Sequence, residues 1–107
     1  MIYELRIYDI HPGKMQAIND RFAHFTLSIF AKHGMRVTEF WQDIDDNRNR
    51  LYYVMEFSDM EARNQSFESF YNDPEWQEVK SETEKEGPIV AKVESVFLRQ
   101  VPYFPQP

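Results

Sequence analysis

The order of hydrophobic periodicities along the chain constrains its fold more than any single motif does. Apolar residues alternate in residues 2–9, recur every three or four positions in 14–33, alternate in 35–42 and 51–57, return to helical spacing in 60–83, and alternate again in 89–99. Alternation is typical of strands, and the three-to-four spacing is typical of helices. The sequence therefore predicts a βαββαβ order of elements within 107 residues.

Capping residues support the predicted helix boundaries. Gly34 is expected in a left-handed conformation where the first helix ends. Ser58 and Glu61 have the spacing of a capping box at the start of the second helix, with Ser58 as N-cap. Asp73 and Pro74 are expected to interrupt this helix and restart it, because Asp is a good N-cap and Pro is tolerated in the first turn.

Four strands and two helices in this order predict an α+β fold, a ferredoxin-like βαββαβ sandwich with a four-stranded antiparallel sheet. The first and third strands are expected in the middle of the sheet. One face of each is expected to lie against the helices; these residues are Tyr3, Leu5 and Ile7 on the first strand and Tyr53, Met55 and Phe57 on the third.

The other face of the sheet has no predicted cover from its own chain. Its expected residues are Glu4, Arg6, Tyr8, Tyr52, Val54 and Glu56. Tyrosines and paired charges suit an interface better than a fully solvated face, and Arg6 can neutralise Glu4 or Glu56 once they are desolvated. We therefore expect a homodimer through this face, in which two sheets pair into a dimeric α/β barrel.

Residues 1–100 are predicted to form a single domain, and residues 101–107 a Pro-rich C-terminal tail. The tail carries three prolines together with Tyr103 and Phe104. Because these aromatic side chains are apolar and prolines favour an extended chain, we expect the tail to lie across the protein surface, on the same subunit or its partner.

Composition excludes several classes of function. There is no cysteine, so disulfides and thiolate ligands are absent. The net charge of −6 argues against binding to nucleic acid through phosphates. No segment approaches the ~20 apolar residues of a membrane span, and the amino terminus lacks the features of a signal peptide. We expect a soluble cytoplasmic protein without nucleic-acid or membrane partners.

Several short blocks, taken together, resemble the NIPSNAP family. They are Met1-Ile2-Tyr3-Glu4-Leu5-Arg6, Pro12-Gly13-Lys14, Lys32-His33-Gly34, Phe40-Trp41 and Asp73-Pro74-Glu75-Trp76, and they span the chain from Met1 to about Tyr103. The family often has Gly where this sequence has Glu39. The resemblance implies a dimeric α/β barrel, a fold shared with cofactor-independent monooxygenases. It implies no established reaction.

His33 is the best candidate for a catalytic residue. At 100° per residue it projects at the same angle as Met15, on the inner face of the first helix, so it is a candidate base or ligand contact. Alternatively, it caps carbonyls of the last helical turn before Gly34. His24 projects to solvent, and His11 lies in a turn. The histidine spacing predicts no metal site, and a haem would have only His33 as its proximal ligand.

Four aromatic residues are candidates to line a ligand cavity between sheet and helices, together with His33: Tyr3, Trp41, Tyr53 and Trp76. The alternative is that they form a packed core. Three function classes follow, in this order: a cofactor-independent monooxygenase or isomerase acting on a small apolar or aromatic metabolite, a non-catalytic binding or adaptor protein, and a haem or metal protein. No cofactor is expected.

Overall fold

The predicted elements form in the predicted order, and each helical region is divided. The computed structural model describes residues 1–105. Its elements are β1 (Ile2–Ile10), α1 (Met15–Arg21), the π-helical turn η1 (Phe22–Thr26), α2 (Leu27–Lys32), β2 (Arg36–Gln42), β3 (Arg50–Phe57), α3 (Met60–Tyr71), α4 (Pro74–Thr83) and β4 (Val90–Leu98).

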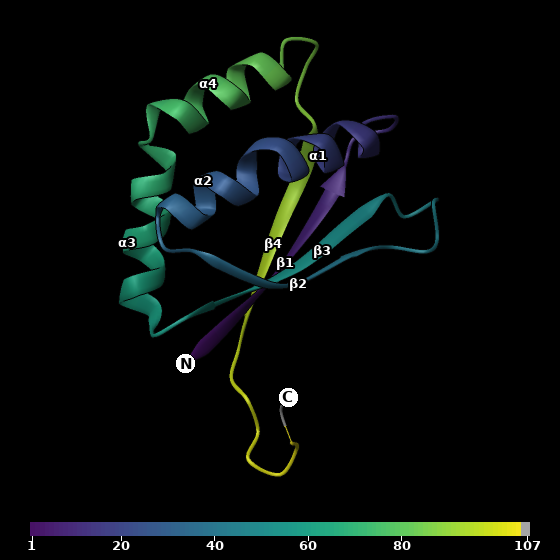
Figure 1. Cartoon of the computed structure of the whole chain (residues 1–107). Coiled ribbons are helices and arrows are strands. Elements are labelled where there is room, and N and C mark those ends of the chain that lie inside the picture. Colours follow the sequence, from purple (N-terminus) through teal and green to yellow (C-terminus); the bar gives the residue numbers. More distant parts are fainter. Residues whose placement is uncertain (106–107) are drawn as a thin grey trace.

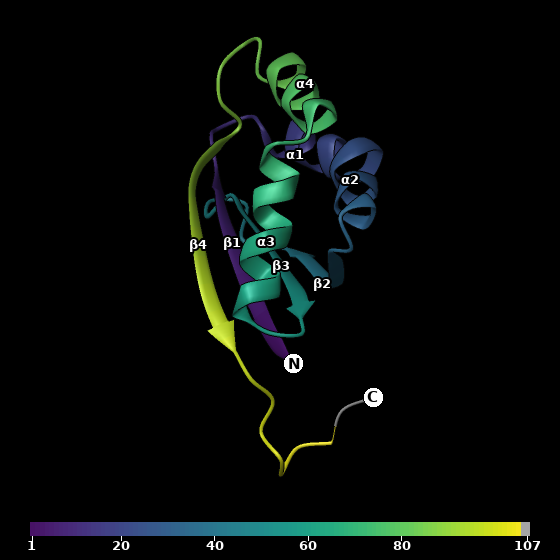
Figure 2. The ribbon, with the colours of Figure 1, turned by 90° about the vertical axis from the view of Figure 1, so that its left-hand side faces the viewer.

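The four strands form one antiparallel sheet in the order β2-β3-β1-β4, so β1 and β3 are central as predicted. All the helices lie on one face of this sheet (Figures 1 and 2). The α+β ferredoxin-like fold is confirmed. None of the helices within residues 1–105 combines the length and the apolar character that a membrane span needs.

Two of the three predicted helix-boundary signals are correct. Gly34 has φ +70° after α2, and the Asp73 carboxylate accepts a hydrogen bond from the Glu75 backbone N–H at 2.8 Å, with Pro74 opening α4. The N-cap of α3 is Asp59, whose carboxylate accepts from the Ala62 N–H at 2.8 Å. The predicted N-cap, Ser58, was wrong by one residue. Asp59 directly precedes the helix, and its ionised carboxylate is a good acceptor for the first backbone N–H groups.

The turn η1 was not predicted, and it changes which side chains face inward. A π-helical turn holds more residues than an α-helical turn, so it shifts the phase of the helix that follows. Phe25 follows Phe22 by three positions and so belongs to the apolar spacing expected over residues 14–33, but it is 44% exposed, whereas Thr26 is buried. Phe30 and Ile29 remain in the core after the shift.

The predicted face of β1 was wrong. Glu4, Arg6 and Tyr8 point to the helices and are buried, at 0%, 5% and 9% exposure, so they do not lie on the open face. Their neighbours across the sheet are residues of β3 that belong to the core, with Glu4 opposite Met55. The apolar set of Tyr3, Leu5 and Ile7 instead lies on the open face.

This inverted arrangement is possible because the buried charges satisfy one another. The Glu4 carboxylate accepts hydrogen bonds from Arg6 (2.8 Å), from Arg63 of α3 (2.8 and 2.9 Å) and from Ser95 of β4 (2.8 Å). Burial raises the pKa of Glu4, but these hydrogen bonds outweigh burial and hold it below the ordinary value. Phe67 of α3 lies 4.6 Å from the Arg6 guanidinium and 4.4 Å from that of Arg63. The alternation of apolar and polar residues in a strand does not indicate which charged side chains will pair, so it could not predict this buried cluster.

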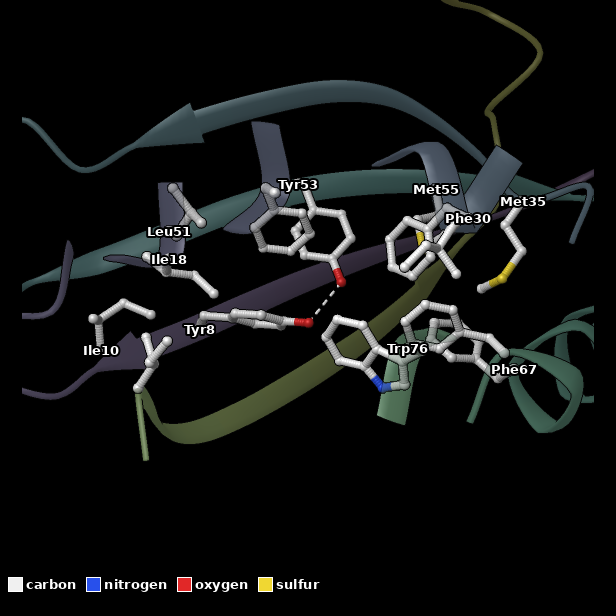
Figure 3. Close-up of a cluster of buried hydrophobic side chains, with 14 of the residues drawn as sticks. Tyr8, Ile10, Ile18, Phe30, Met35, Leu51, Tyr53, Met55, Phe67 and Trp76 are labelled. Carbon is white, nitrogen blue, oxygen red and sulfur yellow. Dashed lines mark hydrogen bonds between the residues drawn. The ribbon is translucent and has the colours of Figure 1, made fainter. Parts of the chain in front are cut away.

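The face of β3 was predicted correctly. Tyr53, Met55 and Phe57 are buried against the helices with Leu51. Figure 3 shows this core, with the side chains of β1 and β3 converging on those of the helices. Phe30 and Trp76 contribute from α2 and α4.

An ionic cluster joins the end of α2 to the start of α4. Asp73 contacts both the Lys32 ammonium and, at 2.7 Å, Nε2 of His33. Lys32 also contacts Glu75 at 3.0 Å. Hydrogen bonds from Lys32 and His33 hold the pKa of the Asp73 carboxyl below its ordinary value.

The described part of the tail does not pack on its own domain. Residues 101–105 extend away from the sheet (Figure 1), with Tyr103 84% and Phe104 64% exposed. The expectation that the tail lies across its own subunit was therefore wrong for these residues. Docking on a partner stays a prediction, and residues 106–107 lie outside the described part.

Replacing Glu4 by Gln is expected to lower the free energy of unfolding by about 3 kcal/mol or more, because two guanidinium groups then lose their shared buried counter-charge. Asp9→Asn on the same strand is the control, since the Asp9–Arg50 pair is largely exposed, and it should cost less than about 1 kcal/mol. Urea unfolding monitored by circular dichroism measures both. Equal effects would contradict the role given to Glu4.

The Asp73 cluster predicts an acid-dependent loss of stability. The folded protein keeps this carboxylate ionised at lower pH than the unfolded chain does, so the free energy of unfolding should fall as pH decreases below about 4. Asp73→Asn keeps a side-chain cap on α4 but has no such proton to bind. Urea unfolding at pH 5 and pH 3 should show a smaller decrease for this variant than for the parent protein; an identical decrease would contradict the assignment.

Candidate functional site

A cavity and a groove lie between the sheet and the helices, on the side of β1 and β4. The inner cavity, about 50 Å³, is enclosed between Arg6 and Tyr8 of β1, residues of α1, η1 and α2, and those of α3 and α4. The outer groove, about 350 Å³, runs from the same residues past α4 to β4. Both are lined by Arg6, Tyr8, Arg21, Tyr71 and Trp76. The outer groove is within the size range of small-molecule sites.

Two tyrosines and an arginine form a hydrogen-bonded chain at the cavity wall. Arg6 Nε donates to the Tyr53 hydroxyl at 2.6 Å, and the hydroxyls of Tyr53 and Tyr8 are 2.8 Å apart. Figure 3 shows these two hydroxyl groups pointing at one another. Burial raises the pKa of Tyr53 well above its ordinary value, so Tyr53 stays neutral at physiological pH.

The direction of this chain follows from counting acceptors. Tyr53 is fully buried, and its oxygen already accepts from Arg6. Among residues 1–105 its only other partner is the Tyr8 oxygen, so the Tyr53 proton must be donated there to avoid a buried unpaired hydroxyl. Tyr8 then accepts, and its own O–H remains to donate to a molecule in the cavity.

Arg21, the last residue of α1, connects the cavity with the groove. Its Nη1 donates to Glu84 at 2.9 Å and to Thr83 at 3.3 Å, both near the end of α4. The carbon at the centre of its guanidinium lies 5.2 Å from the centre of the Trp76 ring. Arg21 directly precedes the π-helical turn, an irregularity that often occurs at functional sites.

The polar groups on these walls are nearly all hydrogen-bond donors. Arg6, Arg21 and the Tyr8 hydroxyl donate, and the Thr26 hydroxyl donates to the Arg21 carbonyl at 3.3 Å. Within residues 1–105, Glu84 is the one carboxylate on either wall, and Arg21 holds it. No group of three residues with metal-binding side chains is found in this described part of the chain.

The structure brings together only part of the predicted ligand-binding set. Tyr53 and Trp76 lie at or beside the cavity, as expected. Tyr3 lies on the open face of the sheet, opposite Glu56, and Trp41 of β2 is half exposed on that same face. For Tyr3 and Trp41 the predicted location was wrong: Tyr3 follows the inverted phase of β1, and a bulge in β2 sets the phase of Trp41.

His33 does not line the cavity or the groove, so its predicted place at the cavity wall was wrong. Nε2 of its ring contacts the Asp73 carboxylate at 2.7 Å rather than a carbonyl of the last helical turn. The partner comes from α4, which lies 40 positions further along the chain. That contact is tertiary, and the helical phase of His33 carries no information about it.

Sequence reasoning missed Arg21 and placed Arg6 and Tyr8 on the wrong face. A signal was present for Arg21, since it follows Ile18 by three positions and flanks the apolar stripe of the helix. A charged residue at the edge of such a stripe favours a buried role for that charge. For Arg6 and Tyr8 hydropathy gave the opposite indication.

A larger groove, about 570 Å³, lies on the open face of the sheet. It is bounded by Tyr3, Val54 and Glu56, by β2, and by Val101 and Phe104 of the tail. Its walls include the projecting tail and four charged residues, of which Arg36 and Glu56 pair with each other at 3.0 Å. The Arg36 side chain on this wall is largely exposed to solvent, whereas the arginines of the inner cavity are buried, so we place the candidate site at the cavity.

Comparisons with solved structures agree with this architecture. A NIPSNAP domain protein of Burkholderia xenovorans has a TM-score of 0.83 at 24% identity, covering 99% of this chain and 100% of its own. A NIPSNAP family protein of Agrobacterium tumefaciens has a TM-score of 0.84 at 18% identity, covering 97% and 96%. A Nitrosomonas europaea protein that bears the name of an antibiotic biosynthesis monooxygenase has a TM-score of 0.65 at 12% identity, covering 94% and 99%. These likenesses establish the fold.

The family itself is established by sequence. A search of curated proteins found no match, but the family model of NIPSNAP matches residues 3–105, nearly the whole chain. This match covers every block that carried the resemblance except the first two residues, and it includes the cavity, the groove and both sides of the sheet. The chain belongs to the NIPSNAP family.

Proposed function

We propose that the protein binds a small aromatic molecule in the inner cavity and outer groove, and that the Tyr8 hydroxyl donates a hydrogen bond to an oxygen of that molecule. The observation that carries this proposal is the chain from Arg6 through Tyr53 to Tyr8, which leaves the Tyr8 proton for a ligand. Aromatic walls formed by Phe70, Tyr71 and Trp76 suit a ring.

The same geometry defines the chemistry that the site favours. The Tyr8 donor, backed by the Arg6 charge through Tyr53, stabilises negative charge that develops on a ligand oxygen. Isomerisation through an enolate, and oxygenation of an enolate by dioxygen, both create such an anion. In the second reaction a methylene group becomes a carbonyl, one atom of dioxygen enters the product, and the other leaves as water.

A purely binding role is the second candidate, and one observation favours it. Proton abstraction needs a base at the reacting carbon, and the carboxylate on the walls, Glu84, is held by Arg21. Glu4 is saturated by three side chains, which keep its pKa low. Catalysis is therefore confined to substrates that ionise readily without a protein base, whereas binding needs only the donors.

The open face of the sheet supports a further proposal, that a second copy of the chain covers it. The half-exposed residues on this face are mainly apolar or tyrosine: Tyr3, Leu5, Ile7, Tyr52, Val54 and Val96. Glu56 is neutralised by Arg36. Two identical faces of this composition are self-complementary, as a two-fold interface requires. The apolar tail emerges beside the same face.

The ligand proposal predicts a selective effect of Tyr8→Phe. Acetophenone offers a carbonyl acceptor and ethylbenzene does not, so the variant should bind acetophenone about two- to tenfold more weakly, with ethylbenzene unchanged. Affinities are measured from shifts of backbone amide signals of groove residues in ¹H–¹⁵N spectra. Tyr52→Phe, which removes a hydroxyl bound to Asp43, is the matched control. Unchanged acetophenone affinity in Tyr8→Phe would contradict the role of the hydroxyl.

The dimer proposal predicts that Leu5→Glu gives a monomer. Pairing the faces would bury a carboxylate without a partner, at a cost of several kcal/mol, while the isolated domain keeps this position open to water. Sedimentation velocity at micromolar concentration should show a dimer for the parent protein. Ser81→Glu, on exposed surface of α4, should leave the dimer intact. A monomeric parent protein would refute the proposal.

A further inference from the structure

One edge of the buried Arg21 guanidinium has no partner. Nη1 is engaged by Glu84 and Thr83. Nε is fully buried and donates to no acceptor within residues 1–105, the single such side-chain atom in that part of the chain. Nη2 makes no hydrogen bond there either. The side chain as a whole is only 6% exposed.

This edge has the geometry of an anion site. Nε and Nη2 of arginine form a planar fork that fits the two oxygens of a carboxylate. Native proteins pair nearly all their buried donors, so a buried fork without an acceptor in a residue that lines a cavity indicates a group that arrives from outside. Arg21 lies on the wall that the cavity and the groove share.

The charges around the fork favour an anion, although the chain as a whole carries −6. Arg21 and Glu84 balance each other. Arg6 and Arg63 share the single carboxylate of Glu4, and Lys80 lines the groove without an ion pair within the described residues. Lys92 also lines the groove.

The surroundings of the fork also define the rest of the ligand. Trp76 lies beneath the Arg21 guanidinium, and its ring centre is 4.6 Å from that of Phe70. These rings fix the plane of the guanidinium and give an adjacent apolar wall. The inner cavity, about 50 Å³, has room for one small polar group, and the outer groove, about 350 Å³, has room for a ring.

We propose that Arg21 binds the carboxylate of an aromatic acid, with the ring against Trp76 and Phe70. This inference rests on the proposed function, because it names the class of molecule that the cavity and groove take. It gives Arg21 the anchoring role and leaves Tyr8 to bind a second oxygen of the same molecule.

The test compares benzoate with benzamide, which has a similar shape and no charge. Two signals in ¹H–¹⁵N spectra separate the questions: the Trp76 indole N–H reports any ligand in the groove, and the Arg21 Nε–H reports the fork. Trp41, on the open face, is the internal control. Benzoate is expected to shift both groove signals and to bind at least about tenfold more tightly than benzamide.

Substitutions then assign the effect. Arg21→Met should remove the preference for benzoate, whereas Arg48→Met, an exposed arginine in the β2–β3 turn, should keep it. Glu84→Gln retains a hydrogen-bond acceptor for Arg21 but removes the competing charge, so benzoate should bind about two- to fivefold more tightly. Because Glu84→Gln is a separate variant, this measurement tests the anion site even if Arg21→Met does not fold. Thermal melting of each variant verifies the fold.

The possible outcomes test the anion site separately from the proposed function on which it rests. Equal binding of benzoate and benzamide, with the Trp76 signal shifted, overturns the anion site and leaves aromatic binding in place. If benzoate, benzamide and acetophenone all leave the Trp76 signal unshifted, both the anion site and the proposed aromatic binding are overturned. An Arg21 Nε–H signal that benzoate leaves unchanged also overturns the anion site. The last probe is phenyl phosphate. If it binds more tightly than benzoate and Arg21→Met removes that binding, the group that the fork binds is a phosphate instead of a carboxylate.

Discussion

The buried carboxylate of Glu4 is the constraint on which the rest of the structure depends. It accepts from guanidinium groups on its own strand and on α3, and from Ser95 on the edge strand β4. Three elements are thereby fixed to one point in the interior. Because a charge buried without partners is strongly unfavourable, Glu4, Arg6 and Arg63 must be satisfied together. Once they are, β1 has no freedom to present its other face to the helices.

This constraint also creates the candidate site. Turning Arg6 inward puts a guanidinium beneath the helices, where it donates to Tyr53 and sets the direction of the hydroxyl chain to Tyr8. It leaves Leu5 and its apolar neighbours on the open face instead. One choice of strand phase thus determines both a polar, donor-rich cavity within the domain and an apolar surface outside it, which are the two features that the proposals use.

The sequence predicted the order of elements, the central position of β1 and β3, and the inward face of β3. These depend on local properties: the period of the apolar residues, the left-handed Gly34, and the Asp73-Pro74 start of α4. It failed at β1 because hydropathy favours burial of Tyr3, Leu5 and Ile7, whereas the buried face carries charged residues. Those charges are satisfied by side chains of α3 and β4, which the sequence of β1 does not reveal. It failed at Phe25 because a π-helical turn leaves no regular signal in the spacing of side chains.

By itself, then, the sequence determined the family and the fold class, since both follow from short sequence blocks and from the order of the elements, which are local patterns. Only the tertiary structure decided which groups meet. His33 was paired with Asp73 across 40 positions. Arg21 was brought to the cavity with one edge of its guanidinium lacking an acceptor within residues 1–105. Hydrogen bonds and ion pairs of this kind depend on distances between elements, and those distances exist only after the helices have packed on the sheet.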